Sequence, residues 1–169
     1  WLPAVNRSLA LPLAKGLGNG MPIGACLARG KASDLFTAGS HGSTFGGNPL
    51  ACRVASCVLD IVERDELNIR AQELGAHILK SFKKCLGNVP DVQEIRGQGL
   101  MIGIEFRESA PDFIQYALAR EKILLNISRE KVLRILPALI MTDVEAVELV
   151  DRTVRAIRCY CQKDYPKVG

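Results

Sequence analysis

A lysine near the start of the chain stands beside a glycine-rich segment. Lys15 follows two apolar residues and precedes three glycines within the next five positions. Burial lowers the pKa of a lysine because desolvation disfavours its charged form, and a neutral amine can attack an aldehyde to form a Schiff base. The spacing fits neither a Walker phosphate loop nor the Gly-x-Gly-x-x-Gly dinucleotide motif. Two interpretations of Lys15 therefore stay open, a Schiff-base lysine and a surface lysine beside a flexible loop.

The second candidate is the polar loop of residues 41–48. It holds Ser43 and Thr44 among glycines, directly before a predicted helix. Small hydroxyl side chains and backbone amides ahead of a helix start favour binding of a phosphate or another anion. The alternative is an ordinary Ser/Thr/Gly loop that ends in an N-cap.

Arg134 is the third candidate, because it interrupts the apolar run of residues 132–137. An arginine buried in such a strand needs an anionic partner, since an unpaired buried charge is costly. Its planar fork matches a substrate carboxylate, but a structural salt bridge or an edge-strand position also fits. His77 is predicted to be a solvated helix residue, and Glu105 has no nucleophile paired with it.

The elements that must position these residues fall into two parts, residues 1–66 and 67–169. The first part is glycine-rich and irregular, with one buried strand expected over residues 23–28. Asn48 as N-cap and Pro49 at the first helical position then predict a helix to about residue 64. This helix is apolar on most of its faces, which is typical of a helix covered by a larger body.

The second part has the pattern of a compact α/β unit. It predicts helices from residue 67 to Gly87 and over 111–122, and strands over 92–96, 100–106, 123–126 and 132–136. Thr142 and Glu145 form a capping box that starts a last helix. The inner face of that helix is expected to carry Val147, Val150, Val154 and Ile157.

Composition excludes several classes of protein. Of 169 residues, 48% are hydrophobic and 24% charged, and the net charge of +4 comes from dispersed lysines and arginines, which argues against nucleic-acid binding. No apolar run is long enough for a transmembrane helix. With only two histidines and no Cys-x-x-Cys pair, no metal site is expected. Three of six cysteines (Cys26, Cys52 and Cys57) lie in apolar runs and are predicted to be free and buried, as in a reducing, cytoplasmic compartment.

Three ordered motifs resemble those of the class III pyridoxal-phosphate-dependent aminotransferases. They are the lysine segment of residues 14–25, the loop motif of residues 41–52 and the segment of residues 96–103. The stretch of residues 124–137 is similar to the acetylornithine aminotransferases of this family. The likeness runs from about residue 13 to about 158, although Asn19 stands where a third glycine is common.

The resemblance implies a fold and residue roles. The fold would be α/β, that of the fold-type-I pyridoxal-phosphate transferases. Residues 1–66 would form the end of the large cofactor-binding domain, and residues 67–169 the small C-terminal α+β domain. Lys15 matches the lysine that holds the cofactor, and Thr44 a threonine that binds its phosphate across a dimer interface. Ser43 matches a serine beside the acyl-ornithine substrate, and Arg134 the arginine that grips the α-carboxylate.

The resemblance also implies an activity. A cytoplasmic homodimer would move the δ-amino group of N-acetylornithine to 2-oxoglutarate, giving glutamate, in arginine biosynthesis. Family members place further cofactor contacts before the lysine, so this chain is expected to be the C-terminal part of such an enzyme and inactive alone. The alternatives are an ornithine, succinylornithine or 4-aminobutyrate aminotransferase, or a catalytically inert truncated product.

Overall fold

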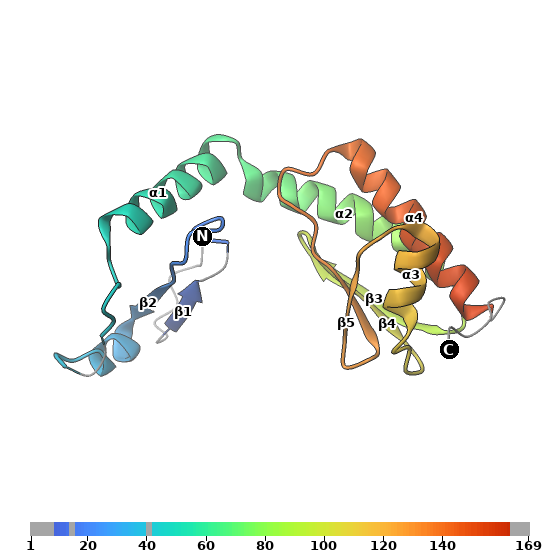
Figure 1. The fold of residues 1–169 in the computed structure, drawn as a ribbon, viewed down its shortest axis with the longest axis horizontal. Coiled ribbons are helices and arrows are strands. Elements are labelled where there is room, and N and C mark those ends of the chain that lie inside the picture. Colours follow the sequence, from blue (N-terminus) through green and yellow to red (C-terminus); the bar gives the residue numbers. More distant parts are fainter. Residues whose placement is uncertain (1–8, 14–15, 40–41, 163–169) are drawn as a thin grey trace. The chain divides into compact units, whose positions relative to one another are not determined.

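The computed structural model describes residues 9–13 (backbone only), 16–39 and 42–162, and the chain divides into two compact units, Trp1–Asp65 and Glu66–Gly169. In the first unit, β1 (Leu9–Leu13) pairs antiparallel with β2 (Ala25–Arg29), and the short 3-10 helix η1 (Gly30–Leu35) follows (Figure 1). The sequence reasoning did not predict β1, which contains Pro12. Proline is tolerated there because an edge strand does not need every backbone donor.

The helix α1 (Pro49–Arg64) begins where its capping signals predict. The side chain of Asn48 accepts a hydrogen bond from the backbone amide of Ala51 at 2.9 Å, and Pro49 occupies the first turn. Only Ala51 and Ala55 of this helix are buried, whereas large apolar side chains of α1 such as Leu50 are exposed. The predicted helix is therefore confirmed, with much of its apolar surface open.

The second unit is an antiparallel sheet with three helices on one face (Figure 1). The strands, in spatial order, are β3 (Val92–Gln98), β4 (Met101–Phe106), β6 (Val132–Ile135) and β5 (Asn126–Ser128). The helices are α2 (Leu67–Leu86), α3 (Phe113–Glu121) and α4 (Asp143–Cys161). Within this unit, none of these helices covers the opposite face of the sheet.

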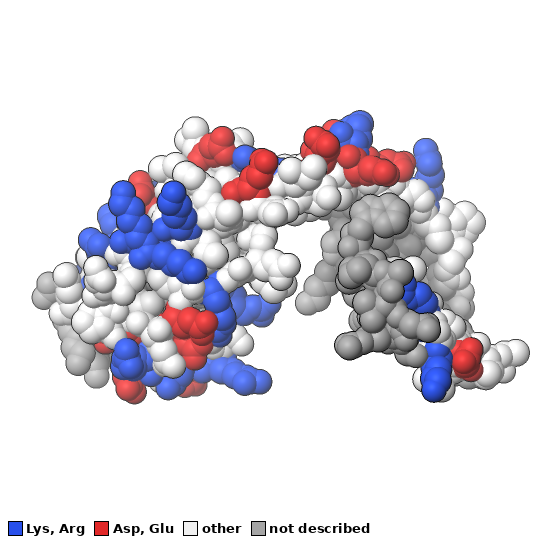
Figure 2. All heavy atoms as spheres, turned by 180° about the vertical axis from the view of Figure 1, so that it is seen from behind, with Lys and Arg blue, Asp and Glu red and all other residues white. Residues whose placement is uncertain are grey.

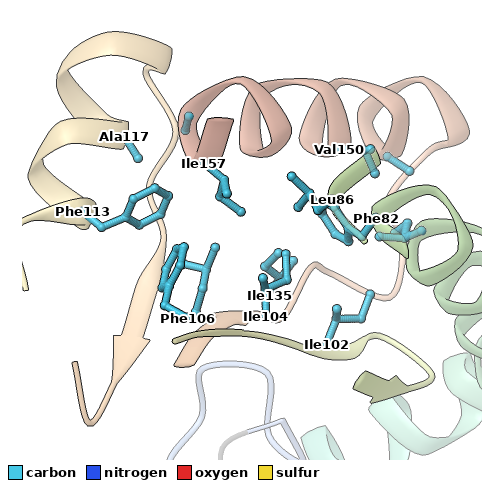
Figure 3. Packing of buried hydrophobic residues seen from close by; sticks show 14 of the residues in the cluster. Phe82, Leu86, Ile102, Ile104, Phe106, Phe113, Ala117, Ile135, Val150 and Ile157 are labelled. Atoms are coloured by element: carbon cyan, nitrogen blue, oxygen red, sulfur yellow. The ribbon is translucent and has the colours of Figure 1, made fainter. Parts of the chain in front are cut away.

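The core lies between the sheet and the helices. Figure 3 shows Phe82 of α2 and Ile157 of α4 facing Ile102 and Ile104 of β4, and all four are at most 2% exposed. Alternate residues of β4 point into this core, as the two-residue period of a strand requires. Full burial of a large apolar side chain contributes roughly 1.5–3 kcal/mol, so the core fixes which residues face outward.

Two details of the second unit differ from the prediction. Residues 123–126 were expected to be a strand, but β5 begins at Asn126, because α3 ends with Lys122 in the left-handed region (φ 52°) and Ile123 and Leu125 pack on the core unpaired. Val147 was expected on the inner face of α4 but is 52% exposed. Val150 and Ile157 are buried as predicted and Val154 packs partly buried against the core, whereas Ala146 takes the buried position expected for Val147.

Charged side chains of both signs lie on the surface of the second unit. Figure 2 shows lysine and arginine atoms gathered on one part of the visible face, with aspartate and glutamate atoms mainly elsewhere on it. Within the described ranges, no helix combines the length and the apolar character needed to cross a membrane.

Candidate functional site

Two arginines flank a glycine on the open face of the sheet. Arg96 of β3 and Arg134 of β6 are both register partners of Gly103 in β4, one from each side. Leu133 and Ile135 are buried, so strand alternation directs Arg134 away from the core. A Cβ on Gly103 would lie 3.5 Å from Cγ1 of Val132, an ordinary contact, so the glycine leaves space without being needed to avoid a clash.

This part of the sheet forms an open groove of about 600 Å³. Its polar lining includes Arg96, Gln98, Ser128, Arg129 and Arg134. A groove with three guanidinium groups favours an anionic ligand.

Arg96 is already engaged with acidic side chains. Its Nη1 lies 2.6 Å from Oε2 of Glu94 and 2.5 Å from Oε2 of Glu105. The hydrogen bond to Glu105 is the main cause that raises the pKa of the Arg96 guanidinium above its ordinary value. Glu105 is therefore the partner of an arginine, not a candidate base.

Arg134 has a different environment. Its side chain is exposed, and no carboxylate in the described part of the chain forms an ion pair with it. The expectation of a buried arginine is thus wrong, because Arg134 lies on the outward face of β6. An exposed guanidinium without an ion pair, in a groove, is available to a ligand carboxylate.

Ser43 and Thr44 lie in the loop that leads into α1. Both are exposed, and the backbone amide of Gly46 closes a turn onto the carbonyl of Ser43 at 3.3 Å. Neither hydroxyl has a hydrogen-bond partner among the residues that the structure describes. Hydroxyls and amides ahead of a 16-residue helix are suited to a phosphate group.

Lys15 and His41 lie outside the described residues, so the role of Lys15 stays a prediction. The segment after Lys15 forms turns, with the amide of Met21 donating to the carbonyl of Gly18 at 2.9 Å. A Cβ at Gly18 would lie 2.1 Å from the carbonyl oxygen of Met21, so only glycine fits at this position. Asn19 adopts φ 44°, a conformation that asparagine tolerates better than most residues.

The structure groups the candidates by unit. Ser43 and Thr44 belong to the first unit, and Arg134 lies with Arg96 in the second. Sequence reasoning missed the pairing of Arg96 with Glu105. Arg96 lies opposite Gly103, and Glu105 follows Gly103 by two residues, so both side chains are on the same face of the sheet. His77 is exposed on α2, as predicted.

The cysteines of the first unit are less buried than predicted. All six cysteines are free, as expected, but Cys26 and Cys52 are exposed and Cys57 is only partly buried, so their predicted burial is wrong. Both apolar runs lie on surfaces that the described residues of the first unit leave open. Over the ranges that the structure describes, no group of three or more His, Cys, Asp or Glu side chains could hold a metal ion.

Comparison with protein families gives a match over most of the chain. The sequence model for "Aminotransferase class-III" matches residues 10–157. The chain belongs to the class III aminotransferases. This confirms the family predicted from the three motifs.

Curated relatives are similar over a limited part of their own length. The acetylornithine aminotransferase of Nitrosomonas europaea is 50% identical over 141 residues, which are 83% of this chain and 36% of that protein. The ornithine aminotransferase of Staphylococcus carnosus is 42% identical over 141 residues, 83% of this chain and 35% of that protein. The chain thus spans little more than a third of these relatives.

Solved structures show the same fold. The ornithine aminotransferase of Toxoplasma gondii matches with a TM-score of 0.82 and 34% identity, covering 91% of this chain and 38% of that one. The acetylornithine aminotransferase of Elizabethkingia anophelis matches with a TM-score of 0.77 and 32% identity, covering 88% and 40%. The predicted α/β fold of the fold-type-I pyridoxal-phosphate transferases is confirmed.

Proposed function

We propose that the chain forms part of a pyridoxal-phosphate-dependent aminotransferase that moves the δ-amino group of N-acetylornithine to 2-oxoglutarate, in arginine biosynthesis. Family membership and 50% identity to an acetylornithine aminotransferase support the reaction. The observation that carries the proposal is the exposed guanidinium of Arg134, which lacks an ion pair within the described chain and lies in a basic groove.

Arg134 binds the α-carboxylate of the substrate in this proposal. The substrates and the product share one group: N-acetylornithine, 2-oxoglutarate and glutamate each carry an α-carboxylate. Binding this carboxylate orients the rest of the molecule. A charge-assisted, two-point hydrogen bond from an arginine contributes roughly 1.5–3 kcal/mol, which is about ten- to a hundredfold in binding. Lysine offers a point charge and cannot reproduce the planar fork.

Thr44 and Ser43 fit the cofactor phosphate and the acyl substrate. Their hydroxyls are exposed, have no partner among the described residues and precede the N-terminus of α1. Thr44 donates a hydrogen bond to a phosphate oxygen in this proposal, across a homodimer interface. Ser43 lies beside the acyl-ornithine chain in the same proposal.

Lys15 holds the cofactor through its Nζ atom. Bound pyridoxal phosphate supplies the electron sink that allows the substrate carbon to release a proton. When not joined to the cofactor, the Nζ of Lys15 would act as general base and acid, taking that proton from the substrate and returning it.

The two units correspond to two domains in this proposal. Residues 1–66 are the end of the large cofactor-binding domain, and residues 67–169 are the small domain. The division between Asp65 and Glu66 supports this boundary. We also propose that the chain alone is inactive, because it spans 36% of its acetylornithine aminotransferase relative.

Ornithine is the second candidate substrate. The relative from Staphylococcus carnosus and the structure from Toxoplasma gondii are both named as ornithine aminotransferases. Comparing kcat/KM for N-acetylornithine and for ornithine decides between the two substrates.

The role of Arg134 can be tested in a chimera in which residues 10–157 replace the matching segment of the Nitrosomonas europaea relative. Arg134→Ala is expected to lower kcat/KM for both N-acetylornithine and 2-oxoglutarate about ten- to a hundredfold, and Arg134→Lys to restore it only in part. Arg120→Ala, an exposed arginine of α3 that forms no ion pair within the described residues, is the control. Unchanged constants for both substrates would show that Arg134 is structural.

The role of Lys15 has a separate test. Borohydride reduction of the same chimera with pyridoxal phosphate, followed by peptide mapping, is expected to place the covalent adduct on Lys15. An adduct on any other lysine would refute the assignment.

A further inference from the structure

Glu105 lies within reach of two arginines. Gly103 has Arg96 on one side and Arg134 on the other, and Glu105 follows two residues later on the same face of β4. Both arginines are thus diagonal neighbours of Glu105, at a separation that long side chains span. Gly103 has no side chain that would separate them.

Only one of these two pairings is formed. Glu105 pairs with Arg96 at 2.5 Å, and Glu94 approaches the same nitrogen at 2.6 Å. The Glu105 side chain is only 25% exposed. A carboxylate so far removed from water needs a cationic partner, because its unpaired charge is costly to bury.

We propose that Arg96 is a positioning residue that holds the carboxylate of Glu105 and so leaves Arg134 free for a substrate carboxylate. Only the last step, binding of the substrate, rests on the function proposed above. Arg96 itself touches neither substrate nor cofactor in this proposal.

Loss of Arg96 has a defined consequence. Glu105 would turn to the remaining diagonal arginine, Arg134, and compete there with any incoming carboxylate. Ion pairs of this partly exposed kind change an equilibrium by about two- to fivefold. The effect is therefore measurable without abolishing binding.

The first test uses the 169-residue chain and needs no catalysis. Phenylglyoxal modifies free guanidinium groups, and peptide mass spectrometry gives the rate at Arg134. Arg96→Gln is expected to slow this rate about two- to fivefold, and Arg96→Gln combined with Glu105→Gln to restore it. Both variants lack Arg96, so structural damage from its loss would affect them equally, and only the double variant removes the competing carboxylate.

Glu94→Gln is the matched control. It removes the other carboxylate at Arg96 but keeps the Arg96–Glu105 pair, so the rate at Arg134 should not change. Equal rates at Arg134 in all variants would overturn the proposal. If Arg96→Gln slows the modification of Arg129 and not that of Arg134, the proposal is also overturned, because Glu105 would then pair with Arg129.

The second test uses the chimera described above. Arg96→Gln is expected to raise KM for 2-oxoglutarate about two- to fivefold with kcat unchanged, and Glu105→Gln in addition to restore KM. If the modification rates follow the proposal but KM does not, the carboxylate-binding role of Arg134 fails and the pairing of Glu105 stands. If Arg134→Ala raises KM but Arg96→Gln does not slow its modification, the proposed function stands and this inference fails.

Discussion

Gly75 allows α2 to pack directly on the turn between β3 and β4. A Cβ at this position would lie 2.0 Å from the carbonyl oxygen of Gly99 and 2.3 Å from its carbonyl carbon. Both atoms belong to the backbone and cannot rotate away. Gly75→Ala would therefore push α2 from the hairpin that carries Arg96 and Gly103.

The size of the effect follows from two opposing contributions. Restoring an ordinary contact of about 3.5 Å to the carbonyl carbon, which would lie at 2.3 Å, requires α2 and the turn to separate by roughly 1.2 Å. Overpacking of this kind costs about 3 kcal/mol at the upper end of its usual range, whereas alanine gains about 1 kcal/mol over glycine in a helix. We expect a net loss of about 2 kcal/mol in the free energy of unfolding.

Urea unfolding followed by far-ultraviolet circular dichroism measures this loss. The midpoint should fall by about 1 M, at an unchanged slope. Gln72→Ala, an exposed substitution in the same helix, is the matched control and should shift stability by less than about 0.5 kcal/mol. A Gly75→Ala midpoint equal to or above that of the unaltered chain would refute the packing argument, because helix propensity would then outweigh the contact with Gly99.

Three further outcomes are expected. Lys122→Gly should stabilise the second unit by about 0.5–1 kcal/mol in thermal unfolding, because glycine adopts the left-handed conformation (φ 52°) at the end of α3 at lower cost; a lower melting temperature would contradict this. Thr142→Ala removes the cap of α4 and should cost about 1 kcal/mol in urea unfolding. Hydrogen bonds from Thr142, first from its backbone amide and then from its hydroxyl, lower the pKa of Glu145 below its ordinary value of 4.5. The capping box therefore stabilises the fold above that pH and loses its effect as pH falls through the lowered pKa; an equal acid sensitivity in Glu145→Gln, which removes the titrating carboxylate, would exclude this coupling. Burial, followed by the charge of Asp91, raises the pKa of the Cys161 thiol to about 11, so iodoacetamide near neutral pH should label it at least roughly tenfold more slowly than the exposed Cys52; equal labelling rates would show that the thiol is not desolvated.

Local signals in the sequence predicted the helices well. Asn48 with Pro49, and Thr142 with Glu145, start α1 and α4 at the expected residues, because a cap acts within one helical turn. Gly87 ends α2 in the same way. These contacts join residues close in sequence, so one sequence suffices to predict them.

Contacts between distant residues were not predictable in the same way. β1 was missed, and the strand expected over residues 123–126 is displaced to β5, because pairing partners and not local propensity decide which extended residues form a strand. The pairing of Arg96 with Glu105 depends on the register of β3 against β4. The resemblance pointed to Arg134, but only the sheet register shows that it lies beside Gly103.

The core, through this register, determines which way Arg134 points. Leu133 and Ile135 flank it in β6 and are 0% and 3% exposed. Because side chains alternate along a strand, a shift by one residue would expose both apolar side chains and turn Arg134 into the core. Losing their burial would cost roughly 1.5–3 kcal/mol each, and the buried guanidinium would need a partner that the core lacks. The apolar residues on either side of Arg134 therefore keep its guanidinium on the open face. Substitutions that weaken their packing should displace Arg134 in the groove although they change no charged residue.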